Sequence, residues 1–235
     1  HDWSGDGGSF YWPSYAQQCC SAFWLGKISV VLDCQFAAIM VLVTAQLEIL
    51  SARLANLRPD GRALRESPNC KVKLSYVDHD SEMYDELRRA IQSHQEILSF
   101  VSCLQQVMSP LAMTQFVCSV IVICVVLFQA TYSQDFATVL KCVAFLPVPC
   151  GQVFIYCWAA DNMTEQAKEV SSAAYRCCWV DAGPRFKRCL LLVIRRAQRR
   201  LVLNAGHLNI DRAAFLSLVN ASYSFYTLLA QMNRS

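Results

Sequence analysis

Residues 213–232 read AAFLSLVNASYSFYTLLAQM, and this stretch decides the class of the protein. It holds no charged side chain, and its length matches the roughly 20 helical residues that cross a bilayer core. Five polar residues within it follow at steps of three, four, three and four: Ser217, Asn220, Ser224, Thr227 and Gln231. On an α-helix these steps form one stripe. Lipid cannot satisfy such groups, so we expect the stripe to face a water-filled space or other helices, and this helix is where we expect an ion path.

Three further apolar stretches predict membrane spans, at residues 25–50, 107–132 and 136–160. The chain of 235 residues is 54% hydrophobic and only 17% charged, which is too apolar for an ordinary soluble domain. We therefore expect an all-α fold, a polytopic membrane helix bundle with four transmembrane helices. The chain begins at His1 without the pattern of a signal peptide, so we expect it to be a piece of a longer protein.

The distribution of positive charge predicts the orientation. Eighteen of the 21 Lys and Arg residues lie in residues 51–94 or 161–212, between the predicted spans. The positive-inside rule makes both regions cytoplasmic. We therefore expect 1–24 to be an extracellular loop, 25–160 to hold three transmembrane helices with a cytoplasmic loop at 51–106, and 161–212 to be a cytoplasmic assembly region. Residues 213–235 then form the pore-lining last helix and an external C-terminus.

Local signals refine the helices. Pro59 and Pro68 mark a turn-rich stretch, and Ser81 is a plausible N-cap for a helix that runs into the second span. Pro110 is expected to interrupt that span, and the sequence PVPCG at 147–151 to bend or unwind the third. The second break is compatible both with a packing kink and with the wall of a binding pocket.

The segment RFKRCLLLVIRRAQRR, residues 185–200, is basic at both ends with an apolar centre. Such a segment can lie on a membrane surface or bind calmodulin. Its place between two predicted spans favours a helix packed beneath the membrane in the assembly region.

Enzyme and metal chemistry find no support in the sequence. The chain has no H-E-x-x-H, G-x-x-x-x-G-K-[ST] or G-x-S-x-G pattern, and its four His residues are scattered. The 13 Cys residues include no C-x-x-C pair, so we expect most of them to be packing residues, with Cys177 and Cys178 as weak candidates for palmitoylation. We expect no catalytic residue, metal or cofactor. Nucleic acid is a poor candidate partner because the basic clusters flank membrane spans.

Several short elements carry a resemblance to a known family. Tyr175 and Trp179 match an A-x-Y-x-x-x-W element, residues 203–206 match an L-x-A-G step, and residues 222–224 form S-Y-S in the last span. In this order they resemble the C-terminal part of insect odorant receptors, a seven-helix family with inverted topology. The resemblance implies that the four spans are helices four to seven.

The resemblance also implies a function. In this family an odorant-binding subunit and a shared co-receptor form a hetero-tetramer, a ligand-gated non-selective cation channel in the plasma membrane of the sensory neuron dendrite. The chain lacks the long cytoplasmic insertion of the co-receptor, so the resemblance favours the subunit that binds the small volatile organic ligand.

Residues can be assigned to these roles by position. The pore and gate would include the polar stripe and three residues that align with the co-receptor's late Val, Gln and Leu, namely Leu228, Gln231 and Met232. Ligand contacts are expected in the outer half of the bundle, from Leu32, Asp33, Phe36, Phe128, Tyr132 and Phe145. Assembly contacts are expected from His94, Tyr175 and Trp179.

Two alternatives remain open from the sequence. A gustatory receptor shares the topology, although the S-Y-S element and the Gln231-Met232 pair are closer to the odorant type. A transporter would use Asp33, Lys141 and the PVPCG break as coupling sites, but the four spans show no internal repeat.

Overall fold

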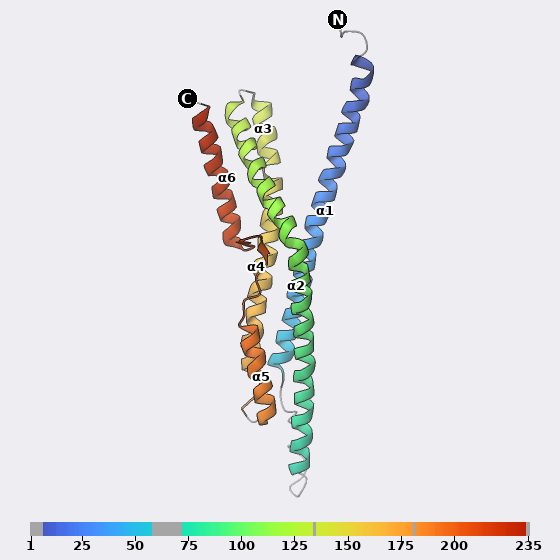
Figure 1. Cartoon of the computed structure of the whole chain (residues 1–235), viewed down its shortest axis with the longest axis vertical. Helices are drawn as coiled ribbons and strands as arrows, with labels where there is room; N and C mark the ends of the chain where they lie inside the picture. Colours follow the sequence, from blue (N-terminus) through green and yellow to red (C-terminus); the bar gives the residue numbers. More distant parts are fainter. Residues whose placement is uncertain (1–6, 58–71, 134, 181, 234–235) are drawn as a thin grey trace.

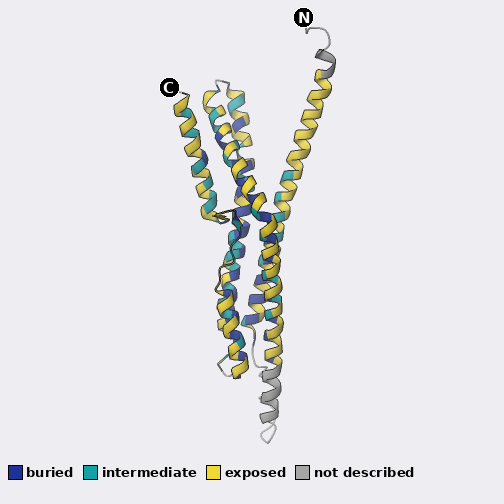
Figure 2. Ribbon diagram, viewed as in Figure 1, coloured by how far each residue is buried: buried dark blue, intermediate teal, exposed yellow. Residues whose placement is uncertain are grey.

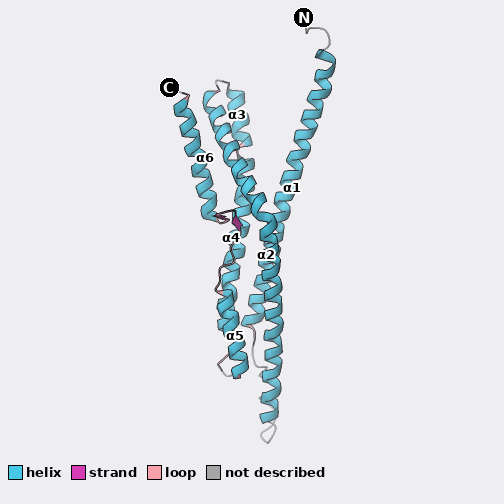
Figure 3. Cartoon of the chain, in the orientation of Figure 1, coloured by secondary structure: helices cyan, strands magenta, loops and turns pink. Residues whose placement is uncertain are grey.

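Helices make up nearly all of the computed structural model, which describes residues 7–57, 72–133, 135–180 and 182–233 (Figure 3). The helices are α1 (Gly7–Ala55), α2 (Val72–Tyr132), α3 (Phe136–Phe145), α4 (Pro147–Arg176), α5 (Pro184–Ala197) and α6 (Arg212–Met232). The strands β1 (Asn204–Ala205) and β2 (Leu208–Asn209) form an antiparallel hairpin. Four helical stretches within the described residues are long and apolar enough to cross a membrane. The all-α membrane bundle with four transmembrane helices is thereby confirmed.

The bundle has two ends of different character (Figure 1). The beginning of α1, the end of α6 and the α2–α3 connection lie at one end, which we call the outer end. The inner end holds α5 together with the last turns of α1, the first part of α2 and the end of α4. Two connecting segments meet there, because the Cys178 amide donates to the Leu57 carbonyl at 3.2 Å.

The core is concentrated in the inner half, whereas the outer half of α1 stands apart and is largely exposed (Figure 2). α1 packs mainly on α4. Met40, Leu47, Met163 and Val170 are fully buried in the core. Trp12 and Trp24 near the outer end of α1 are 71% and 64% exposed, as expected of apolar side chains that face lipid or further helices.

The helix α5 is amphipathic, which explains the basic segment at residues 185–200. Phe186, Leu190, Val193 and Ala197 are buried on one face, at the spacing of a helical stripe. Arg185, Arg188 and Arg195 are exposed on the others. Pro184 occupies the first helical position, where its missing N–H costs nothing. The predicted helix in this segment is confirmed, and it packs against α4.

Two predicted helix boundaries were wrong. Residues 7–24 are helical and not a loop, since residues 14–24 after Pro13 contain neither Gly nor Pro to end the helix. The helix α2 begins at Val72, before Ser81, again because residues 72–81 carry no helix breaker. The turn-rich stretch at Pro59 and Pro68 lies outside the described residues.

The two proline predictions had different outcomes. Pro110 does not interrupt α2, which stays helical on both sides of it, and the Pro110 carbonyl accepts a bond from the Thr114 hydroxyl at 2.9 Å. The interruption near PVPCG is found only as a one-residue break: α3 ends at Phe145, Leu146 keeps helical φ and ψ of −57° and −36°, and α4 begins at Pro147, so residues 147–151 are helical and not unwound. Proline at the first position of α4 cannot donate to the preceding helix, so the helix restarts there.

Candidate functional site

The polar stripe of α6 lies on the face that points away from the rest of the chain. Ser217, Asn220, Ser224 and Gln231 are exposed and Thr227 is half-buried. The opposite side packs inward, with Ser222 1% exposed and Phe215 in edge contact with Phe154 of α4, at 5.5 Å between ring centroids. The helical period predicted from sequence therefore places the stripe on a single free surface.

The stripe contains two kinds of polar group. Its hydroxyls are satisfied by their own helix: Ser217 donates to Ala213, Ser224 to Asn220 and Thr227 to Ser224, at 2.8–3.0 Å. For the side-chain amides of Asn220 and Gln231, no hydrogen bond is found within the described residues. Amides that project from a membrane helix need water or another subunit. The amides therefore mark the part of the stripe with the strongest requirement for a polar neighbour.

Leu228 borders both the stripe and a groove between α2 and α6. The groove has a volume of about 510 Å³ and is lined by apolar side chains, including Phe116 and Val120 of α2 and Leu228 and Leu229 of α6. Met232, at 68% exposure, lies one turn further toward the outer end. Leu228 thus lines the groove while remaining 53% exposed.

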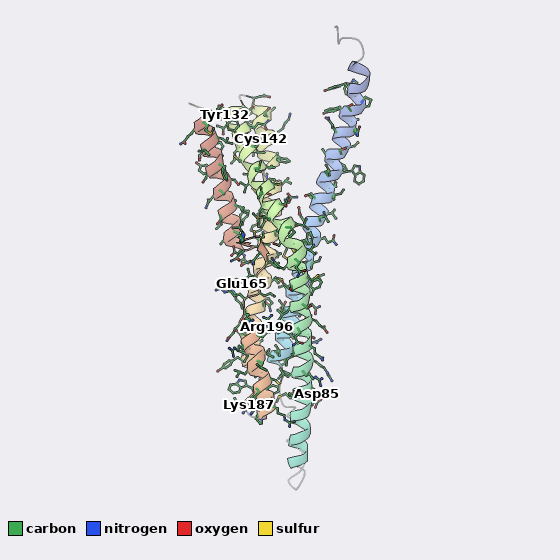
Figure 4. All side chains as sticks on the ribbon, in the orientation of Figure 1. Asp85, Tyr132, Cys142, Glu165, Lys187 and Arg196 are labelled. Atoms are coloured by element: carbon green, nitrogen blue, oxygen red, sulfur yellow. The ribbon has the colours of Figure 1, made fainter. Side chains whose placement is uncertain are left out.

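Two hydrogen bonds connect α6 to α2 at the outer end. The hydroxyls of Thr131 and Tyr226 are 2.9 Å apart, and the Tyr132 hydroxyl donates to the Ala230 carbonyl at 3.2 Å. Figure 4 labels Tyr132 beside the outer end of α6. The Tyr132 ring also packs on Phe128, with centroids 4.6 Å apart. Of the residues predicted to contact ligand, Tyr132 therefore bonds directly to α6, and Phe128 is linked to α6 through the Tyr132 ring.

The other predicted ligand residues lie elsewhere. On α1, Leu32 is 47% exposed and Phe36 packs against the core, while Phe145 at the end of α3 is 51% exposed. Asp33 accepts a hydrogen bond at Oδ1 from the hydroxyl of Tyr156 on α4, at 3.0 Å. Its Oδ2 is enclosed and has no hydrogen-bond partner among the described residues. None of the six predicted residues lines the groove between α2 and α6.

The predicted assembly residues divide into two groups. His94 is only 6% exposed, so it is enclosed by its own chain, which differs from the partner contact predicted for it. Tyr175 is 66% exposed, and Trp179 is half-buried. The Trp179 indole donates to the Tyr175 carbonyl at 3.1 Å, and their rings are 6.1 Å apart. This pair remains available at the surface near the inner end.

Comparison with known proteins identifies the family. The family model described as 7tm Odorant receptor matches residues 1–223. The chain belongs to this odorant receptor family. Odorant receptor 10 of Aedes albopictus is 30% identical over 145 residues, which are 61% of this chain and 39% of that protein. Odorant receptor 85c of Drosophila melanogaster is 32% identical, over 68% of this chain and 42% of its own length. The chain thus spans about two fifths of the length of these relatives.

A solved structure shows the same fold. The insect olfactory receptor OR5 from Machilis hrabei, in complex with eugenol, superposes with a TM-score of 0.59 at 16% sequence identity, covering 88% of this chain and 69% of that one. The odorant receptor family accounts for the membrane bundle and removes the gustatory receptor as an alternative. The matching relatives are named as odorant receptors.

Proposed function

We propose that this chain is part of an odorant-tuning receptor subunit which, with a shared co-receptor, forms a hetero-tetrameric, ligand-gated, non-selective cation channel. A small volatile organic molecule opens the channel, and α6 of each subunit lines the pore. The observation that supports this proposal is the free polar face of α6, where two amides have no partner within the described residues. A membrane helix with such a face is stable only beside water or another polar surface.

The gate is formed by the outer part of that face. Leu228 and Met232 are exposed apolar side chains at 53% and 68%, and apolar constrictions close channels by excluding water. Gln231 lies beside them and offers an amide dipole to a passing ion. When α6 tilts, Leu228 withdraws further into the groove that it already lines, and Gln231 is left beside the ion path.

Recording from the full-length receptor with its co-receptor tests this assignment. Leu228→Ala should increase the current measured without odorant, whereas Leu228→Met, which keeps the volume, should leave it unchanged. Gln231→Glu should alter the permeability ratio of divalent to monovalent cations, with Gln231→Asn as the uncharged control. If neither Leu228→Ala nor Gln231→Glu changed the basal current or permeability at equal surface expression, α6 would not line the pore.

The proposed arrangement in the plasma membrane of the sensory dendrite has the C-terminus extracellular and residues 51–106 and 161–212 cytoplasmic. It rests on the 18 basic residues in those two regions. A tag after Ser235 should stain intact cells, and a tag near Pro59 should stain only permeabilised cells. The reverse pattern would contradict the topology and with it the cytoplasmic assembly region.

A transporter is the second candidate because Asp33 places a carboxylate inside the predicted span. Its bond to Tyr156 gives it a structural role between α1 and α4. Odorant-evoked current without accumulation of solute would favour the channel, and accumulation against a gradient would favour the transporter.

A further inference from the structure

The inner end of α6 is attached to α2 through the β1–β2 hairpin. The side-chain amide of Gln105 makes two bonds to the backbone of Asn204: its Nε2 donates to the Asn204 carbonyl at 2.8 Å, and its Oε1 accepts from the Asn204 amide at 2.9 Å. One turn later, the Ser109 hydroxyl accepts from the Gly206 amide at 3.1 Å. Three hydrogen bonds thus hold one hairpin against two successive turns of α2, next to Pro110.

The same segment is attached to α4 on its other side. Arg212, the first residue of α6, pairs with Asp161 at 2.9 Å and donates to the side-chain oxygen of Asn162 at 2.8 Å. The Thr164 hydroxyl donates to the Leu201 carbonyl at 3.0 Å. A cation at a helix N-terminus opposes the helix dipole, so Arg212 does not serve the stability of α6 itself. Its contacts instead fix where α6 begins relative to α4.

The segment between these attachments has little freedom. Leu203, Ala205 and Ile210 are at most 1% exposed, and the Ile210 amide donates to the Leu203 carbonyl at 2.8 Å. Asp211 then caps α6, accepting from the Ala214 amide at 2.7 Å. Buried side chains therefore hold both ends of this segment, while residues 206–209 at the turn and second strand of the hairpin are exposed.

We propose that Gln105 and Arg212 are positioning residues that make residues 201–212 a rigid joint between the bundle and α6. A displacement of α2 or α4 is passed to α6 at its inner end. Among the described residues, the hydrogen bonds from α2 to the outer end of α6 come from Thr131 and Tyr132, whose side chains are exposed. The helix therefore tilts about the joint and its outer rim moves most. This inference rests on the proposed function of α6 as a pore helix.

Charge exchange in the full-length receptor with its co-receptor tests the α4 attachment. Asp161→Arg or Arg212→Asp should reduce the odorant-evoked current per surface receptor at least tenfold. The double variant restores the pair and should return the current to within threefold of the unmodified receptor. A pair with only a structural role would lower surface expression without changing the current per receptor. A double variant no better than the singles would overturn the proposal.

Hydrogen exchange tests the α2 attachment without reference to channel activity. In the purified full-length receptor, Gln105→Leu should speed exchange of the backbone amides of residues 204–206 at least tenfold. Gln106→Leu, at the exposed neighbouring position, is the matched control and should not. Equal exchange in both variants would overturn the joint, even where a charge variant fails to reach the surface. Faster exchange in a receptor that never carries current would support the joint while refuting the proposed channel.

Discussion

Phe186 and Leu191 lie on opposite faces of α5. Substitutions at the two positions can therefore distinguish an effect on the stability of the fold from an effect on assembly with a partner subunit. Phe186 is 1% exposed and fully buried, whereas Leu191 is 66% exposed. Replacing a buried Phe by Ala costs about 3–5 kcal/mol, because the transfer free energy is lost and a cavity remains. Replacement of an exposed side chain usually changes stability by less than about 0.5 kcal/mol.

These magnitudes give a measurable contrast. At roughly 2 °C per kcal/mol for a chain of this size, Phe186→Ala should lower the unfolding temperature of the purified full-length receptor by about 6 °C or more. Leu191→Ala should leave it nearly unchanged. If the exposed face contacts a partner subunit, Leu191→Ala should instead reduce the amount of co-receptor recovered by co-purification, since burying a Leu side chain contributes about 1.5–3 kcal/mol.

The measurement consists of thermal unfolding followed by size-exclusion fluorescence, together with quantitative co-purification from the same cells. Equal losses of unfolding temperature in the two variants would refute the assignment of the faces of α5. Normal co-receptor recovery with Leu191→Ala, and also with Leu191→Ala combined with Leu192→Ala, would remove this face from the assembly surface.

Three further predictions follow from single positions. Gly206 has a φ of 61°, in the left-handed region that residues with a side chain rarely adopt. Gly206→Ala should therefore destabilise the fold by about 1–2 kcal/mol, measured as a lower unfolding temperature. Gly206→Asn should lower the unfolding temperature less, because Asn tolerates this conformation. Burial, and secondarily the charge of Arg196, lower the pKa of His94 below its ordinary value of 6.5. As the pH falls below 6.5, the His94 side chain of the unfolded chain is protonated before that of the folded chain. The free energy of unfolding should therefore decrease between pH 6.5 and the lowered pKa. His94→Leu should flatten that part of the pH profile of the unfolding temperature. Burial, with a smaller effect of Cys178, raises the pKa of Cys177 to about 11; peptide mapping after maleimide treatment at neutral pH should therefore find Cys178, which is exposed, labelled and Cys177 unlabelled.

The features that the sequence predicted well are those that a bilayer imposes. Four apolar stretches, the polar stripe of α6 and the break before Pro147 depend on composition and local period alone. The stripe could be placed on one face because five residues repeat at the period of the helix. Each of these features is read from neighbouring residues, without knowledge of what packs against them.

The features that were missed depend on contacts between distant residues. Tyr156 lies 123 residues from Asp33, and Gln105 lies 99 from Asn204, so nothing local in the sequence marks either pair. In the sequence, Gln105 cannot be distinguished from an exposed polar residue of a helix, although it binds the hairpin. The residues beside His94 likewise give no sign that its side chain is buried. Helix ends were misplaced for a related reason: a helix continues until packing or a breaker ends it, and capping residues are only a weak signal.

The hydrogen bond from the Cys178 amide to the Leu57 carbonyl has a consequence for how these connections tolerate substitution. Because both partners belong to the backbone, the bond closes the inner end of the bundle whatever side chains stand at these two positions. Among ordinary residues only proline at position 178 would remove the donor. We therefore expect substitutions along these two connections, other than proline at position 178, to leave this contact between the helices in place.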